Sequence, residues 1–110
     1  MAGKDFLGEF EQVVMLAVLR LDDAAYAVPI RREIERRTRR SVARGALYVT
    51  LERLEGKGYL ESRLADPTPE RGGRAKRYYK VRPAGVTVLR QSWTALQRMW
   101  EGLEPVTRGT

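Results

Sequence analysis

Arginine and lysine side chains are concentrated in two short segments of the chain, where they offer the chemistry of anion binding. Residues 31–44 include seven arginines and two glutamates, and residues 71–82 include six basic residues and no acidic one. Together the two segments carry a net charge of +11, whereas the other 84 residues carry −4. A positive field confined in this way is typical of a surface that binds a polyanion. A solvated arginine-rich helix followed by a charged hairpin is the alternative interpretation.

The residue types that most enzymes use are missing. The chain has no histidine and no cysteine, which excludes the commonest general base, disulfides and thiolate metal sites. Ser41, Ser62 and Ser92 have no plausible base beside them in the sequence. The glycine pair at residues 72–73 is not followed by a helix, as a phosphate-binding loop requires. We therefore expect a protein that is not an enzyme and that holds no metal or cofactor.

Length and hydropathy predict one globular domain. The chain has 110 residues, of which 43% are hydrophobic and 32% charged, so a modest core is available. Its longest apolar run, residues 13–19, is too short to cross a bilayer, and the first residues do not resemble a signal peptide. The basic segments are not joined to a strongly apolar helix face, which binding to a membrane surface needs. We expect a cytoplasmic protein without membrane contact.

Apolar spacing predicts two helices in the first third of the chain. A helix over residues 9–21 follows from a stripe with alternating intervals of three and four, made by Leu7, Phe10, Val14, Ala17 and Leu21. Two aspartates end this helix. Pro29 suits the first turn of a second helix that runs to about residue 37, because a helix does not need the N–H group that proline lacks at that position. Ile30 and Ile34 form its core face.

A third helix and two strands follow. The helix spans about residues 44–57, and its core face consists of Leu47, Leu51 and Leu54. Gly58 ends this helix as a left-handed cap. Residues 60–65 predict a strand, with Leu60, Ser62 and Leu64 on one face and Glu61, Arg63 and Ala65 on the other. Residues 76–81 return as a second strand with Tyr79 and Val81 in phase. The loop between the strands contains two prolines and a glycine pair.

The last helix is expected to begin near Pro83 and Gly85 and to run to about residue 104. Three helices, a hairpin and a final helix give a mainly α fold with a small β-hairpin wing. This is the order of a winged helix-turn-helix in residues 1–82, followed by a dimerisation helix in residues 83–110, within a single compact unit. In that fold the third helix enters the major groove of DNA and the wing reaches the backbone or the minor groove.

This fold predicts a single DNA-binding face that includes both basic segments. The expected contacts are Arg39, Arg40, Arg44, Gly45, Tyr48, Val49, Arg71, Arg74, Lys76 and Arg77. The N–H groups at the start of the third helix favour phosphate near Arg44 and Gly45. Close helix packing would explain Gly45 equally well, and Tyr48 could instead be a buried structural residue. The glycine pair at residues 72–73 would let the tip of the wing approach a phosphate closely.

The segments "GALYVTLERLEGKGYLESR" and "PERGGRAKRYYKVRPAGVTVLR" resemble the PadR family of bacterial transcriptional regulators. The resemblance covers about residues 10–103, and the single C-terminal helix is similar to the compact subgroup. It implies a homodimeric winged-helix repressor on a pseudo-palindromic operator, often near a transporter or stress gene. Val49 stands where many members carry proline, and "YAVPI" stands where glycine and glutamate are usual. These departures bear on the operator sequence and on the start of the second helix.

The final helix carries an apolar seam with heptad spacing, formed by Val86, Leu89, Trp93, Leu96, Trp100 and Leu103. It predicts that two copies associate through this helix, with helix 9–21 sharing the interface, although packing within one domain is the alternative. Trp93 and Trp100 would meet their counterparts near the two-fold axis, where they could hold a planar aromatic effector. Filling the interface is their alternative role. The resemblance favours an effector, since relatives respond to phenolic or drug-like compounds.

A winged-helix module that binds protein or RNA is the competing function, because a fold does not determine a function. A reader of single-stranded RNA usually offers stacking aromatic side chains. Arg44, Tyr48 and the basic wing suit a regular duplex better, so double-stranded DNA is the expected partner.

Overall fold

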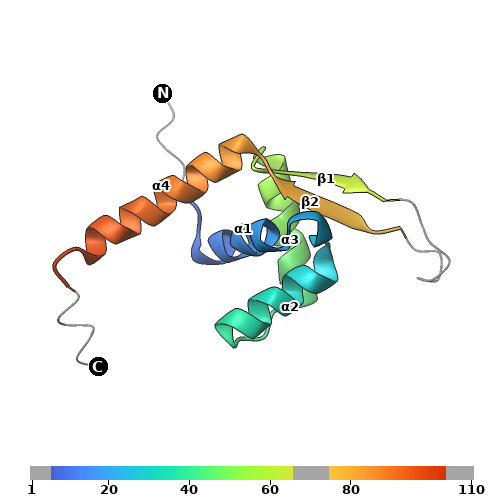
Figure 1. Ribbon diagram of the computed structural model, residues 1–110, viewed down its shortest axis with the longest axis horizontal. Coiled ribbons are helices and arrows are strands. Elements are labelled where there is room, and N and C mark those ends of the chain that lie inside the picture. Colours follow the sequence, from blue (N-terminus) through green and yellow to red (C-terminus); the bar gives the residue numbers. More distant parts are fainter. Residues whose placement is uncertain (1–5, 66–74, 104–110) are drawn as a thin grey trace.

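The computed structural model describes residues 6–65 and 75–103 and shows a helical unit with one two-stranded hairpin (Figure 1). The elements are α1 Glu9–Leu21, a short 3-10 helix η1 Asp22–Ala24, α2 Ala27–Thr38, α3 Arg44–Gly56, β1 Leu60–Leu64, β2 Arg77–Val81 and α4 Pro83–Trp100. The predicted fold class, a mainly α winged helix-turn-helix with a final helix, is confirmed. The first three helices begin and end within about two residues of their predicted bounds.

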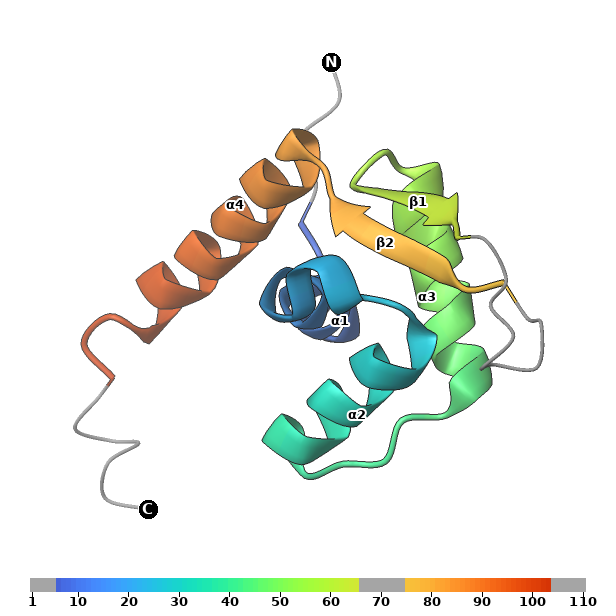
Figure 2. The same cartoon turned by 45° about the vertical axis from the view of Figure 1, so that its right-hand side comes forward.

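Helix α1 lies at the centre of the molecule, with α2, α3, the hairpin and α4 around it (Figure 2). The predicted core residues Val14, Ile30, Ile34, Leu47, Leu51 and Leu54 are all buried. Met15 and Val18 are buried as well, although they lie outside the predicted stripe of α1. Because other elements pack against α1 on several sides, residues on more than one face of this helix are buried.

The end of α3 is set by Gly58, as the sequence predicts. This residue has a φ of +82°, in the left-handed region that favours glycine. The Tyr59 N–H donates to the Leu54 carbonyl, and the Gly58 N–H donates to the Glu55 carbonyl, both at 3.0 Å. This pair of bonds is the Schellman arrangement, and it turns the chain directly from α3 into β1.

Strands β1 and β2 pair antiparallel in a register that places Leu60 opposite Val81 and Leu64 opposite Arg77. Leu60 and Tyr79 are buried, whereas Leu64 is exposed. The two predicted faces are therefore correct. The inner face is buried at Leu60 and exposed at Leu64, closer to the tip of the hairpin. The reason is that the hairpin projects beyond the helices, as Figure 1 shows.

Helix α4 starts at Pro83 and ends at Trp100, so the predicted end near residue 104 is wrong. Glu101 leaves the helical conformation, and Gly102 follows with a φ of +83°. Leu103 consequently lies beyond the helix, not on its seam. The apolar spacing continued to Leu103, but the glycine before it permits the left-handed backbone that stops the helix.

The start of α4 is fixed by close contact with the core. A Cβ atom added at Gly85 would lie 2.3 Å from the Tyr59 carbonyl oxygen and 2.9 Å from Met15 Cε. Only glycine fits this crossing. Further along, the Ser92 hydroxyl accepts a hydrogen bond from the Leu7 N–H at 2.8 Å and donates to the Val88 carbonyl. Among the described residues, no helix has the length and apolar character needed to span a membrane.

Candidate nucleic-acid interface

The turn between α2 and α3 fixes the start of the expected recognition helix. Arg39 adopts the left-handed conformation at φ 60°, and its N–H donates to the Glu35 carbonyl at 2.9 Å. A carboxylate oxygen of Glu35 accepts the Val42 N–H at 2.8 Å, and Val42 is buried. Glu35 therefore holds both ends of the turn and sets how α3 leaves α2.

The first turns of α3 are open to solvent on one side. Arg44, Gly45, Tyr48 and Val49 are exposed there, while Leu47 and Leu51 anchor the opposite side in the core. A Cβ atom added at Gly45 would meet no heavy atom within 4 Å, so close helix packing does not explain this glycine. Tyr48 is half-exposed and is not a buried structural residue. In the described part of the chain no side chain caps α3, so its first N–H groups lack a side-chain acceptor there.

A groove of about 390 Å³ lies between α2 and this end of α3. Its lining includes Arg31, Arg32, Arg44 and Tyr48. Arg31 and Arg32 were not among the residues predicted to bind DNA. The sequence could have indicated them through their position in the first turns of α2, just after Pro29. In the structure this part of α2 lies across the groove from the start of α3. Arg31 Nε lies 3.5 Å from the Glu35 carboxylate, which partly balances its charge.

Three other arginines of the first basic segment, Arg36, Arg37 and Arg40, pair with carboxylates that do not line this groove, so the expected continuous basic face does not include them. Arg39 is exposed beside the turn. Glu33 binds Arg36 at 2.8 Å and Arg37 at 2.5 Å. The hydrogen bond from Arg37, and to a smaller extent the one from Arg36, holds the pKa of the Glu33 carboxyl below its usual value. Arg40 binds Glu9 at 3.1 Å and lies over the Phe10 ring. Among the predicted contacts, Arg40 therefore has partners within its own chain.

The described part of the wing presents Arg77 toward α3. Its guanidinium donates to the Ser62 hydroxyl at 3.0 Å, and this hydroxyl donates to the Glu55 carboxylate at 2.8 Å. Tyr79, two residues along the same face, is buried, and this burial is the main cause that raises the pKa of its hydroxyl. The predicted contacts Arg71 and Arg74 lie outside the described residues, as does the glycine pair between them.

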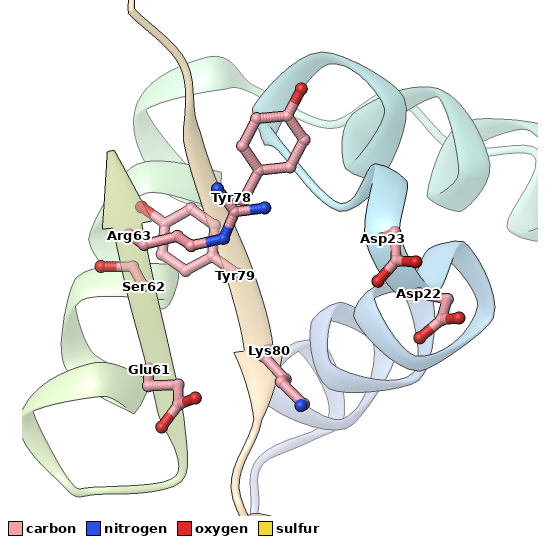
Figure 3. A pocket seen from close by; sticks show the side chains of 8 residues that line it. All are labelled: Asp22, Asp23, Glu61, Ser62, Arg63, Tyr78, Tyr79 and Lys80. Carbon is pink, nitrogen blue, oxygen red and sulfur yellow. The ribbon is translucent and has the colours of Figure 1, made fainter. Parts of the chain in front are cut away.

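The opposite face of the wing is occupied by aromatic contacts. Lys76 Nζ lies 4.1 Å from the centroid of the Tyr26 ring, so this predicted DNA contact is held against α2. The rings of Tyr26 and Tyr78 meet edge to face at 5.3 Å. Figure 3 shows the Arg63 guanidinium against Tyr78, with Asp22 and Asp23 across from β2. Three carboxylates and two cationic side chains line this small hollow, so it has no excess of positive charge to attract a polyanion. The described residues include no group of side chains able to hold a metal ion.

The predicted seam on α4 divides into a buried and an exposed part. Leu89 is buried in the core of its own domain, which corrects its assignment to a dimer seam. Trp93 is 60% exposed, and Leu96, Met99 and Trp100 are also exposed along the half of α4 that extends away from the other elements (Figure 1). An apolar groove of about 320 Å³ between α1 and α4 is lined by Gln12, Leu16, Val86, Leu89, Arg90 and Trp93.

Comparison with known proteins places this geometry among transcriptional regulators. A family model described as the transcriptional regulator PadR-like family matches residues 15–91. A PadR-like transcription factor from "bacteroid fragilis" has a TM-score of 0.73 at 26% identity, with 88% of each chain covered. A PadR family regulator from Eggerthella lenta DSM 2243 has a TM-score of 0.69 at 22% identity, covering 93% of this chain and 88% of the other. A regulator from Clostridium thermocellum has a TM-score of 0.71 at 20% identity, covering 86% and 89%. The curated proteins give no significant match.

Proposed function

Because this chain belongs to the PadR-like family of transcriptional regulators, we propose that it acts as a homodimeric repressor on a pseudo-palindromic DNA operator in the cytoplasm. The family membership makes the chain a DNA-binding regulator and not an enzyme. The observation that carries the finer proposal is the open end of α3. There an unpacked glycine, an exposed arginine and uncapped N–H groups lie together on the helix that enters the major groove in this fold.

Each residue of this surface has a distinct proposed role. The N–H groups at Arg44 and Gly45 bind a backbone phosphate, which can approach closely because Gly45 has no side chain. Val49, which is 54% exposed, contacts the methyl group of a thymine, and Tyr48 bonds a phosphate or a base edge. Arg39 contacts the backbone beside the turn. Arg31 and Arg32 extend the phosphate contacts along α2, and Arg77 supplies them from the wing, with Arg71 and Arg74 at its tip.

The exposed side chains of α4 are the proposed dimer contact. Trp93, Leu96, Met99 and Trp100 form an apolar surface on a part of the helix that its own domain does not cover. Large apolar patches of this kind on a small protein mark an interaction surface. In a two-fold dimer, α4 of one copy would pack beside α4 of the other, and the apolar groove between α1 and α4 would receive the partner's side chains. The two recognition helices would then face half-sites about one helical turn apart, roughly 34 Å.

Trp93 and Trp100 are the proposed contacts for a planar aromatic effector. In the dimer each indole ring would have a counterpart, and indole faces stack on flat aromatic molecules. A ligand held between them would release the operator only if it binds better to a dimer whose α4 helices are arranged differently. Titration with a panel of planar aromatic compounds tests this role. Quenching of tryptophan fluorescence and weaker operator binding, both lost in Trp93→Leu, are expected, and a panel without effect would leave the tryptophans as interface packing alone.

Selection of bound duplexes from a random DNA pool tests the proposed function. We expect enrichment of one sequence with inverted half-sites. A single-stranded RNA pool tested in parallel covers the competing function, and a chain that enriches RNA or neither pool would contradict the operator proposal.

A further inference from the structure

Four side chains form a row where the wing meets the start of α2. Tyr26 immediately precedes α2, and its ring meets the Tyr78 ring of β2 edge to face, with 5.3 Å between centroids and an interplanar angle of 61°. Lys76 Nζ lies 4.1 Å from the Tyr26 centroid, and Arg63 Cζ of β1 lies 5.1 Å from the Tyr78 centroid. A cation from β1 and a cation from the residue just before β2 therefore both contact the tyrosine pair.

A backbone bond reinforces this junction. The Tyr79 N–H donates to the Ala25 carbonyl at 2.8 Å, although the two residues are far apart in the sequence. Tyr79 is buried on the inner face of β2, while Tyr78 on the opposite face contacts Tyr26. The wing is thus fixed on both faces, by the core on one side and by the residues before α2 on the other.

The position of Lys76 argues against a direct phosphate contact. Its ammonium group lies over an aromatic face, where attraction to the ring holds it. Arg77, the next residue, points to the other face and toward Glu55 of α3 through Ser62. Neighbouring residues of a strand alternate between its faces, so the two cations serve different surfaces.

We propose that Tyr26 and Tyr78 are positioning residues that set the direction of the wing relative to α3, and that Lys76 affects DNA binding through Tyr26 instead of touching the DNA. This inference rests on the proposed operator binding. In this proposal, the basic wing can meet the DNA backbone beside the major groove only when the residues before α2 hold the wing at one angle.

Hydrogen exchange of the Tyr79 amide in the free protein tests the junction without DNA. Loss of the ring in Tyr26→Leu should raise the exchange rate of this amide roughly three- to tenfold, since aromatic pairing and a cation–π contact are lost together. Tyr26→Phe keeps the ring and should keep the slow exchange. Lys80 is an exposed lysine of β2 and, among the described residues, lies over no aromatic ring, so Lys80→Ala should also leave the rate unchanged. An unchanged rate in Tyr26→Leu would overturn the proposal.

A double-mutant cycle on the selected operator tests the role in binding. Lys76→Ala and Tyr26→Leu should each lower operator affinity roughly three- to tenfold. The double variant should have the same affinity as the single variant with the lower affinity, because the two changes disrupt one contact. Tyr26→Leu should also reduce the salt dependence of affinity although it removes no charge, because wing contacts are lost with the wing's direction. Additive losses would show that Lys76 acts independently of Tyr26, and an unchanged salt dependence in Tyr26→Leu would show that the wing contacts do not depend on Tyr26; either result would overturn the proposal.

Operator binding and the anchoring of the wing can be tested separately. A wild-type chain that selects no duplex would overturn the operator proposal and, with it, the role of the tyrosines in DNA binding. The exchange rate of the Tyr79 amide would still decide whether the tyrosine pair anchors the wing.

Discussion

The N–H of Leu7 donates a hydrogen bond of 2.8 Å to the hydroxyl of Ser92, and both residues are buried. This bond joins the residue that leads into α1 to the middle of α4. A shift of α4 away from the start of α1 would break this bond. Ser92 therefore connects the helix proposed for dimerisation to the helix that forms the centre of the core.

Replacing this hydroxyl is expected to destabilise the fold. Ser92→Ala leaves the Leu7 N–H buried without an acceptor, which costs about 1–3 kcal/mol in the free energy of unfolding. Thr87→Ala is the matched control, because this hydroxyl of the same helix is exposed and bonds only the Pro83 carbonyl. Urea denaturation of both variants checks the prediction, which fails if Ser92→Ala unfolds at the wild-type midpoint.

Gly85 should tolerate no side chain. The Cβ atom of Gly85→Ala would lie 2.3 Å from the backbone oxygen of Tyr59, so α4 or the turn between α3 and β1 must move. We expect a loss of about 3 kcal/mol or more in unfolding free energy. Gly56→Ala, in α3 with open space around it, should instead be neutral or stabilise by up to about 1 kcal/mol. Equal melting temperatures for the two variants would contradict the packing described for Gly85.

A substitution at Gly45 should change operator affinity without lowering the stability of the fold. Its environment is open, so Gly45→Ala should raise or preserve stability, as in Gly56→Ala. Operator affinity should nevertheless fall, because the added methyl group stands where a phosphate is proposed to approach. Fluorescence anisotropy with the selected operator and thermal unfolding are the two measurements. A Gly45→Ala protein that binds as tightly as wild type would remove this residue from the DNA contact.

The exposed seam of α4 should control the oligomeric state. The double variant Trp93→Ala, Leu96→Ala removes two exposed apolar side chains and should sediment as a monomer that no longer binds the operator cooperatively. Leu64→Ala is the control, because Leu64 is equally exposed but lies on the wing. The dimer proposal is wrong if the wild-type chain remains monomeric at tens of micromolar in the same sedimentation experiment.

Much of the fold could be predicted because its signals are local. The apolar intervals of α1 and α3 and the glycine at position 58 define elements through neighbours in the sequence. The end of α4 was missed because the apolar interval to Leu103 and the glycine at position 102 give opposite signals, and the backbone conformation of Gly102 decides. The burial of Leu89 depends on contact with the core, which no local pattern reveals.

The candidate site was only partly predictable for the same reason. The placement of charge indicated the basic surface, and the helical spacing of Leu47, Leu51 and Leu54 indicated the open face of α3. The partner of each arginine, however, depends on which helix lies beside it. Arg40 meets Glu9 of α1 across 31 positions of sequence, and Lys76 meets the ring of Tyr26 before α2. Arg31 and Arg32 were missed because the groove that they line forms only when α2 and α3 pack together.

The salt dependence of operator binding tests the central claim most directly. If six or more phosphates are bound, affinity should fall roughly 10³-fold or more between about 50 and 200 mM salt. Arg44→Ala should lower the slope of log affinity against log salt by about one, whereas Arg36→Ala should leave it unchanged, because Arg36 is bound to Glu33 and neither residue lines the groove between α2 and α3. A flat salt response in the wild-type chain, or equal effects of Arg44→Ala and Arg36→Ala, would contradict the assignment of the DNA-binding surface to the open end of α3.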